Sequence, residues 1–341
     1  MYFISRSVFV LAAGVALFWG HEVTAQQTEA PEFGPQLQTP KIQSPAAANA
    51  QAKPFPQPQA PFELDAQQQE RLEKILTFWE HKSGNIKTYS CQFVRREYDP
   101  VFGPKNPNVP FKISEGTLRY AAPDKGEFHI ESSKTYRPPA APGGKPAWNA
   151  QAADIGEHWV CDGKSIFELN HKEKKLIESK LPPDLQGQRI TDGPLPFMFG
   201  AKKEKMLQRY WLREVSPMNN QPGQYWLEAT PKTRGDRANF QRVTVILDAD
   251  KFLPLALLVH PPNHDPKRNP ARTSYEFQQR KVDDPIHRGR DFFNQFISPQ
   301  TPVGWQKVVE NLGGPDTPPR PATASNPPPK QARVPQDQPK R

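Results

Sequence analysis

Cysteine is scarce in this chain, with only Cys91 and Cys161 among 341 residues, so at most one intramolecular disulfide can form. In an oxidising compartment the two thiols become a disulfide if the fold brings their Cα atoms within about 7 Å. The alternative is that both cysteines are small buried hydrophobic residues. The sequence leaves both outcomes open.

Long apolar runs are also missing beyond the N-terminus. The mean hydropathy of -0.77 fits a chain that carries many polar segments. A membrane-spanning helix needs about 20 predominantly apolar residues, and no stretch after residue 25 provides them. We therefore expect the mature protein to be soluble.

Signatures of catalysis and of bound metals are absent as well. Lys164 follows Gly163 as at the end of a phosphate-binding loop, but the first glycine of that motif would have to stand where His158 is. The sequence contains no HExxH pair, no cluster with zinc-ligand spacing and no GxSxG elbow. We therefore expect no enzymatic activity, no metal and no cofactor.

What is present begins with an export signal over residues 1–25. Arg6 supplies an early positive charge, an apolar run follows from Val8 to Trp19, and Val23-Thr24-Ala25 gives a small-residue cleavage pattern. The run is short for a bilayer span, so cleavage after Ala25 is favoured over a retained anchor. An exported protein of the periplasm or cell envelope is the expectation.

Both ends of the mature chain are rich in proline. Residues 26–61 form a Pro/Gln/Ala-rich linker with eight prolines, and residues 311–341 form a basic Pro-rich tail with nine. Such segments bury too little apolar surface to fold, so both are expected to be disordered. The net charge of +9 predicts a basic face that meets anionic membranes or envelope polymers, and no nucleic-acid partner is expected.

The folded part is expected over residues 62–310 and begins with a helix. Asp65 can cap it, and Gln68 can complete a capping box three positions later. Apolar residues then recur at helical spacing at Leu72, Ile75, Leu76 and Trp79.

Strand patterns dominate the rest of the folded part. They fall at 89–93, 116–120, 127–131, 158–161, 165–169, 175–178, 210–215, 225–230, 240–247, 254–260 and 273–281. Short connections such as Asp162-Gly163 favour antiparallel pairing. The predicted fold class is α+β, a single curved antiparallel sheet, or unclosed β-barrel, covered by helices.

Large side chains at alternate strand positions would coat one face of this sheet. The candidates are Phe93, Leu118, Tyr120, Phe128, Ile130, Trp159 and Phe167. Such a face either fills as a plain core or leaves an apolar cavity. The apolar segment 194–200 needs an apolar partner, and Phe197, Met198 and Phe199 are the candidates for a lid over the face.

The order of these features resembles the periplasmic lipoprotein carrier LolA and its relatives. The residues that carry the resemblance span roughly 64–309 and comprise Thr88-Tyr89-Ser90-Cys91-Gln92-Phe93, Gly116-Thr117-Leu118, Val160-Cys161-Asp162-Gly163-Lys164, Pro196-Phe197-Met198-Phe199, the strand segments 226–232, 240–245 and 274–277, and 293–305 as a closing strand. A planctomycete-type exported domain family is similar in the same way.

The resemblance implies an unclosed antiparallel barrel capped by helices that binds acyl chains. Ala122 stands where the carrier has a basic residue that latches its lid, and Gly126 stands where the carrier has an aromatic that docks on its membrane partner. Both departures put the carrier's loading cycle in doubt, and no delivery partner is named by the sequence.

The leading hypothesis is a non-catalytic carrier or sensor of lipid or lipoprotein acyl chains, which would lie in an apolar cavity under the lid. The alternative is an envelope scaffold or interaction protein with a filled core and a basic surface. The two differ in whether the face formed by residues such as Leu118 and Phe128 is open or filled.

Overall fold

The computed structural model describes residues 59–311, apart from residues 140–146, 153–155, 184–185, 187–195, 200–201 and 218–221. The predicted signal peptide, most of the linker 26–61 and nearly all of the tail 311–341 lie outside the described residues. The domain boundaries therefore stay a prediction. No helix in the described ranges is both long enough and apolar enough to cross a membrane.

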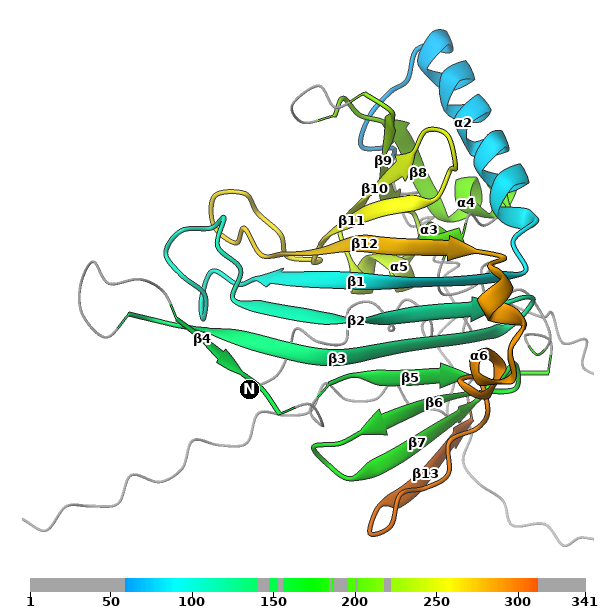
Figure 1. Cartoon of the computed structure of the whole chain (residues 1–341). Helices are drawn as coiled ribbons and strands as arrows, with labels where there is room; N and C mark the ends of the chain where they lie inside the picture. The colour runs from blue at the N-terminus through cyan, green and yellow to red at the C-terminus, as the bar shows by residue number, and fades with distance from the viewer. Residues whose placement is uncertain are drawn as a thin grey trace, which may run out of the picture.

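A single large sheet forms the body of the molecule (Figure 1). Its strands are β1 (Thr88–Tyr98), β2 (Lys112–Ala121), β3 (Lys125–Arg137), β4 (Ala147–Ala150), β5 (His158–Cys161), β6 (Ser165–Asn170), β7 (Lys175–Lys180), β8 (Tyr210–Glu214), β9 (Gln224–Pro231), β10 (Arg242–Asp248), β11 (Pro254–His260), β12 (Arg272–Val282) and β13 (Gln306–Asn311).

The strand order is β13-β7-β6-β5-β3-β2-β1-β12-β11-β10-β9-β8, and β4 pairs with β3 off this path. Neighbouring strands pair antiparallel, except that β13 pairs parallel with β7. Across the described strands, β13 and β8 remain the two outer edges and do not pair with each other. The predicted fold class, an unclosed antiparallel sheet accompanied by helices, is confirmed.

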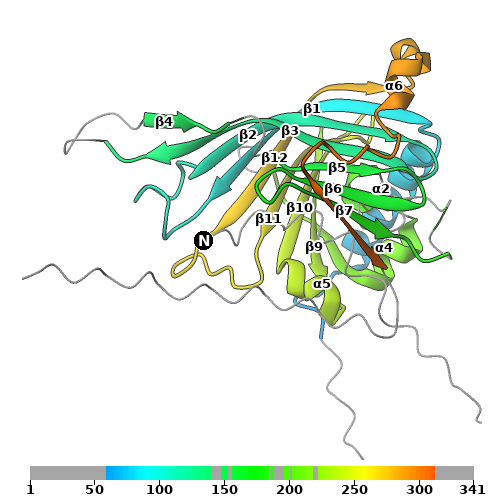
Figure 2. The same cartoon turned by 90° about the horizontal axis from the view of Figure 1, so that it is seen from below.

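The helices are short apart from the first. They are α2 (Ala66–Gly84), α3 (Pro196–Phe199), α4 (Lys203–Arg209), α5 (Arg234–Asn239), the 3-10 turn η3 (Pro285–Arg288) and α6 (Arg290–Asn294). Figure 2 shows α2 and α4 on the inner side of the curved sheet and α6 on its outer side, beyond β1. The cover of the inner face thus includes the long helix α2 and the short helix α4.

Helix α2 begins as the sequence predicts. The Asp65 carboxylate accepts from the Gln68 backbone N–H at 2.8 Å, and the Gln68 side chain accepts from the Asp65 N–H at 3.1 Å. This capping box satisfies two backbone donors that the first helical turn leaves free. The apolar stripe of the helix, Leu72, Ile75, Leu76 and Trp79, is buried against the sheet.

The closing strand predicted at 293–305 is displaced. That segment contains the end of α6 and turns, and the strand begins only at Gln306, as β13. Pro299 and Pro302 have no N–H to donate to a sheet ladder, which accounts for the irregular path before the strand.

Candidate functional site

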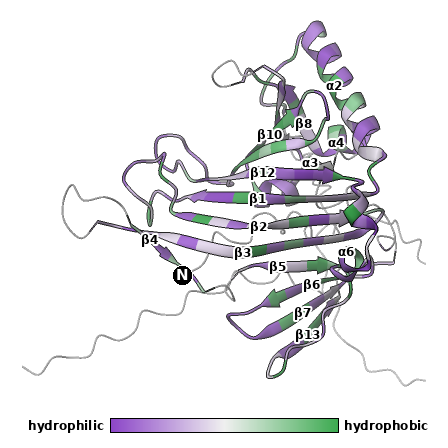
Figure 3. Cartoon of the chain, viewed as in Figure 1, coloured by the Kyte–Doolittle hydropathy of each residue, from purple (hydrophilic) through white to green (hydrophobic). Residues whose placement is uncertain are grey.

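Alternation along the strands divides the sheet into an apolar inner face and a more polar outer face. Figure 3 shows hydrophobic and hydrophilic positions alternating along β1 and β2. Tyr89, Cys91 and Phe93 of β1 point inward, whereas Ser90 and Gln92 lie between them on the other face. The inner face therefore joins the stripe of α2 in one continuous hydrophobic cluster.

The structure brings together six of the seven side chains predicted to coat this face. Five of them, Phe93, Leu118, Tyr120, Phe128 and Ile130, are buried within the main cluster. Trp159 is partly buried and packs against that cluster. The rings of Phe93 and Phe128, on β1 and β3, stack with centroids 4.7 Å apart and planes 14° apart. Whether a ligand enters among them stays a prediction.

Phe167 corrects the prediction, because it lies on the opposite face of the sheet. It pairs with Val160, while Trp159 pairs with Glu168. Directly paired residues of antiparallel strands point to the same face, so this register separates Phe167 from Trp159. Phe167 instead joins Val160 and Leu176 in a small outer cluster.

Two of the three lid candidates are core residues in this structure. Phe197 and Met198 of α3 are only 4% and 5% exposed and belong to the main cluster. The Phe197 ring lies 5.0 Å from that of Tyr210 on β8 and 6.2 Å from that of Phe240. The side chain of Phe199 lies outside what the structure describes.

The two cysteines are free and buried, so the possible disulfide between Cys91 and Cys161 is not formed. They lie on β1 and β5, which are separated by β2 and β3. Three strand spacings amount to about 14 Å, beyond the roughly 7 Å that a disulfide allows between Cα atoms. Burial raises the pKa of Cys91 to about 12 and that of Cys161 to about 11, which leaves both as neutral thiols.

A buried charged group interrupts the apolar inner face near the C-terminal end of β1 and the N-terminal end of β12. Arg95 Nη2 lies 3.0 Å from Glu97 Oε1, and Arg95 Nη1 lies 3.1 Å from Glu157 Oε1. Burial raises the pKa of Tyr275, which lies beside this group. Lys112 Nζ lies 3.9 Å from Glu97 Oε1 and supplies a second positive charge, so two cations face two carboxylates, as buried charges require.

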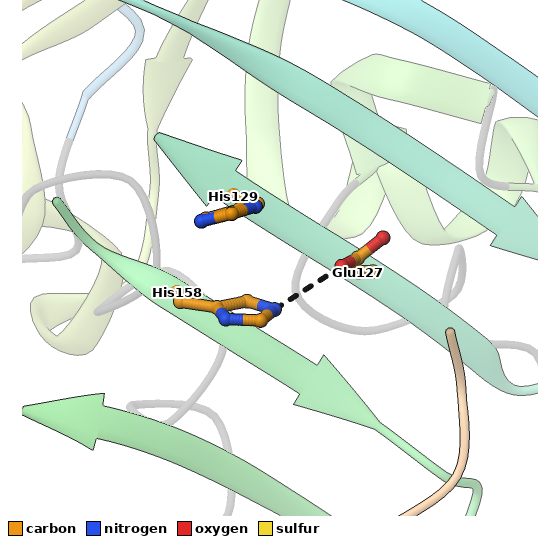
Figure 4. A group of neighbouring side chains, drawn as sticks. All are labelled: Glu127, His129 and His158. Atoms are coloured by element: carbon orange, nitrogen blue, oxygen red, sulfur yellow. Dashed lines mark hydrogen bonds and ion pairs between the residues drawn. The ribbon is translucent and has the colours of Figure 1, made fainter. Parts of the chain in front are cut away.

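Three potential metal ligands meet on the outer face. Glu127 and His129 alternate along β3, and His158 lies opposite His129 on β5 (Figure 4). His158 Nε2 lies 3.1 Å from Glu127 Oε1, and the two imidazole rings stack with centroids 4.1 Å apart. The ligand atoms of all three residues lie within 4.8 Å of one another.

The charges around this group keep the carboxylate ionised. Burial raises the pKa of Glu127, but its contacts with His158 and Arg119 outweigh burial, so the pKa lies below its usual range. Burial lowers the pKa of His129, and the nearby His158 acts in the same direction. Glu127 is therefore an ionised carboxylate near neutral pH, and the His129 imidazole is neutral there.

The expectation of no metal, which rested on ligand spacing along the sequence, did not anticipate this group. Its signal is the strand pattern Glu127-Phe128-His129, in which alternate residues share one face, together with a histidine at the start of a strand that pairs with it. That pairing follows from tertiary structure, since residues 138–157 separate the two strands.

No protein-family model matches this chain, and no curated protein matches it. Among solved structures it is similar to an uncharacterized conserved protein from Thermus thermophilus, with 9% identity over 70% of this chain and 99% of that one and a TM-score of 0.37. It is also similar to a LolA superfamily protein from Nitrosomonas europaea, with 10% identity over 64% and 98% of the two chains and a TM-score of 0.31.

A third similar structure is a putative outer membrane lipoprotein-sorting protein domain from Vibrio parahaemolyticus, with 10% identity over 65% and 95% of the two chains and a TM-score of 0.27. One of these structures is thus named as a member of the LolA superfamily, which the sequence resembles, while the planctomycete-type family stays a prediction. At these TM-scores, the binding properties of this chain have to be inferred from its own residues.

Proposed function

We propose that this chain is an exported, non-catalytic binding protein that accommodates an acyl chain of a lipid or lipoprotein on the inner sheet face. The acyl chain would take the space that Phe197 and Met198 of α3 fill in this structure. The observation that carries the proposal is that a four-residue helix inserts two large side chains into the apolar face of a long curved sheet.

Displacing α3 costs less than displacing α2. Helix α2 spans 19 residues, has a capping box and buries Leu72, Ile75, Leu76 and Trp79. Among the described side chains, α3 contributes only Phe197 and Met198 to the core. Each buried side chain contributes about 1.5–3 kcal/mol, so exposing the two side chains of α3 costs roughly half as much as exposing the four of α2. The short helix is therefore the part of the cover that a ligand would replace.

The free-energy cost of displacing α3 sets a minimum length for the acyl chain. Exposing Phe197 and Met198 costs about 3–6 kcal/mol, and each buried methylene returns about 0.8 kcal/mol. About four to eight methylenes are needed to balance the exchange before the cost of association is counted. Long acyl chains should therefore bind and short ones should not.

The first experiment is native mass spectrometry of the mature protein purified from its own envelope, followed by lipid extraction. Uptake of a fluorescent hexadecanoyl probe and of a hexanoyl probe is then compared for the wild type, Phe197→Asp and the control Phe293→Asp. Phe293 is 45% exposed on the outer-side helix α6. Long-chain uptake by the wild type and the control, but not by Phe197→Asp, supports the proposal.

A folded wild type that takes up neither probe and carries no lipid would refute acyl binding. It would leave the alternative, an envelope scaffold with a filled core. That alternative is supported by the single buried cluster that the described inner-face residues form and by the net charge of +9. A scaffold would bind anionic envelope polymers, and added salt would weaken that binding.

A further inference from the structure

We propose that Glu127, His129 and His158 form a binding site for a divalent transition-metal ion on the outer face of the sheet, opposite the proposed acyl site (Figure 4). Two imidazoles and one carboxylate suit Zn²⁺ and Cu²⁺, which favour imidazole nitrogen over purely oxygen ligands. The proposal is independent of acyl binding, because the three side chains lie on the other face.

The three residues need only a small rearrangement to bind one ion. Their ligand atoms already lie within 4.8 Å of one another. Metal–ligand bonds of about 2.1 Å place two tetrahedral ligands about 3.4 Å apart, so contraction by about 1–1.5 Å is required. The rings of His129 and His158 stack with centroids 4.1 Å apart, and both residues are partly exposed, so side-chain rotation can supply that contraction.

The carboxylate is held ready for coordination. Glu127 is buried, with 3% of its side chain exposed, and it accepts from Arg119 through Oε2 while Oε1 faces His158. A metal ion would replace the His158–Glu127 hydrogen bond and leave the Arg119 contact in place. Outer contacts of this kind orient a ligating carboxylate.

The charge balance is favourable despite Arg119. Glu127 and Glu131 bring two negative charges to this patch of β3 against one positive charge. Glu131 is tied to the patch through the Thr117 hydroxyl, which donates to Glu131 at 3.1 Å and accepts from Arg119 at 3.2 Å. A dication therefore meets a net negative surface.

Other histidines of the described chain do not offer such a group. The ring centroids of His260 and His264 lie 4.3 Å apart, but the Arg242 guanidinium lies within hydrogen-bonding distance of the His260 ring. Both ring nitrogens of His287 are already hydrogen-bonded, to Thr88 and to Ser90. The His260–His264 pair therefore provides a matched control that has two imidazoles without a ligating carboxylate.

The test uses untagged, chelator-stripped full-length protein and Zn²⁺ as the probe. Competition with a chromophoric chelator should give one Zn²⁺ per chain for the wild type and for the control His264→Ala. His129→Ala, His158→Ala and Glu127→Gln should each weaken binding by more than about tenfold. Circular dichroism and the urea midpoint establish that each variant is folded.

A second measurement reports the ligands directly. Electron paramagnetic resonance of the Cu²⁺-loaded protein should show two coordinating imidazole nitrogens in the wild type and one in His129→Gln. The proposal is overturned if the folded wild type binds no more Zn²⁺ than His129→Ala/His158→Ala, or if the single variants bind as tightly as the wild type.

Discussion

The ring centroids of Phe197 and Tyr210 lie 5.0 Å apart, and this contact joins α3 to β8. The Tyr210 ring in turn stacks on Phe240 at 6.0 Å. All three rings are at most 4% exposed. The residue predicted as a lid is therefore a structural part of the core in this state, and its removal has a stability cost that can be measured separately from ligand binding.

Phe197→Ala should lower the free energy of unfolding by about 3–5 kcal/mol, because it removes a buried ring and leaves a cavity. Phe293→Ala should cost less than about 1 kcal/mol, since Phe293 is 45% exposed. Urea denaturation of both variants checks this. Equal losses would show that α3 does not pack on the sheet as described.

Arg95→Met should lower the free energy of unfolding by about 3–5 kcal/mol, because it leaves the Glu97 and Glu157 charges without their buried partner. The neighbouring Arg96 is the matched control. It points to the other face and pairs with Glu276 at the surface, so Arg96→Met should cost at most about 1 kcal/mol. Similar midpoints for the two variants in urea would contradict the burial of the Arg95 group.

The free energy of unfolding should decrease as the pH is lowered, because His260 is held neutral in the folded protein. Burial, followed by the charges of Arg242, His264 and Arg272, lowers the pKa of His260 to about 3 from 6.5. Between these values the unfolded chain binds a proton that the folded chain excludes, so stability falls as the pH falls, by at most about 1.4 kcal/mol per unit from this residue.

This dependence is tested by urea denaturation at pH 7.5 and at pH 5.5. Comparison with His260→Asn isolates the residue from other groups that titrate in the same range. The variant should lose less stability than the wild type between the two pH values. Identical losses would rule out a neutral, buried His260.

The two thiols should resist modification in the native state. Cys91 and Cys161 are buried, and burial raises both pKa values, to about 12 and about 11. Only thiolate reacts readily with alkylating agents. Iodoacetamide should label neither cysteine in native protein and both after unfolding without reductant. A need for reductant before labelling would instead reveal a disulfide.

Local patterns along the chain predicted much of this fold correctly. The capping box of Asp65 and Gln68 and the buried stripe of α2 depend on residues three or four positions apart, where sequence and space coincide. Alternation along β1 to β3 likewise predicted the inward side of Phe93, Leu118 and Phe128. The closing strand was misplaced because a resemblance gives the order of elements, whereas proline sets where the strand can begin.

Side-chain alternation could not say how one strand aligns with the next. Trp159 and Phe167 both match an alternating pattern, yet the register of the β5–β6 hairpin puts them on opposite faces. The same limit hid the group of Glu127, His129 and His158, because only the β3–β5 register places His158 opposite His129.

The amino-acid pattern alone specified an export signal as an expectation, a capped amphipathic helix and strands with one apolar face, since each depends on neighbours along the chain. Tertiary structure set the distance between the two cysteines, the burial of Phe197 and Met198 and the meeting of three metal-ligating side chains. These features depend on strand order and register, which arise from contacts between residues far apart in sequence.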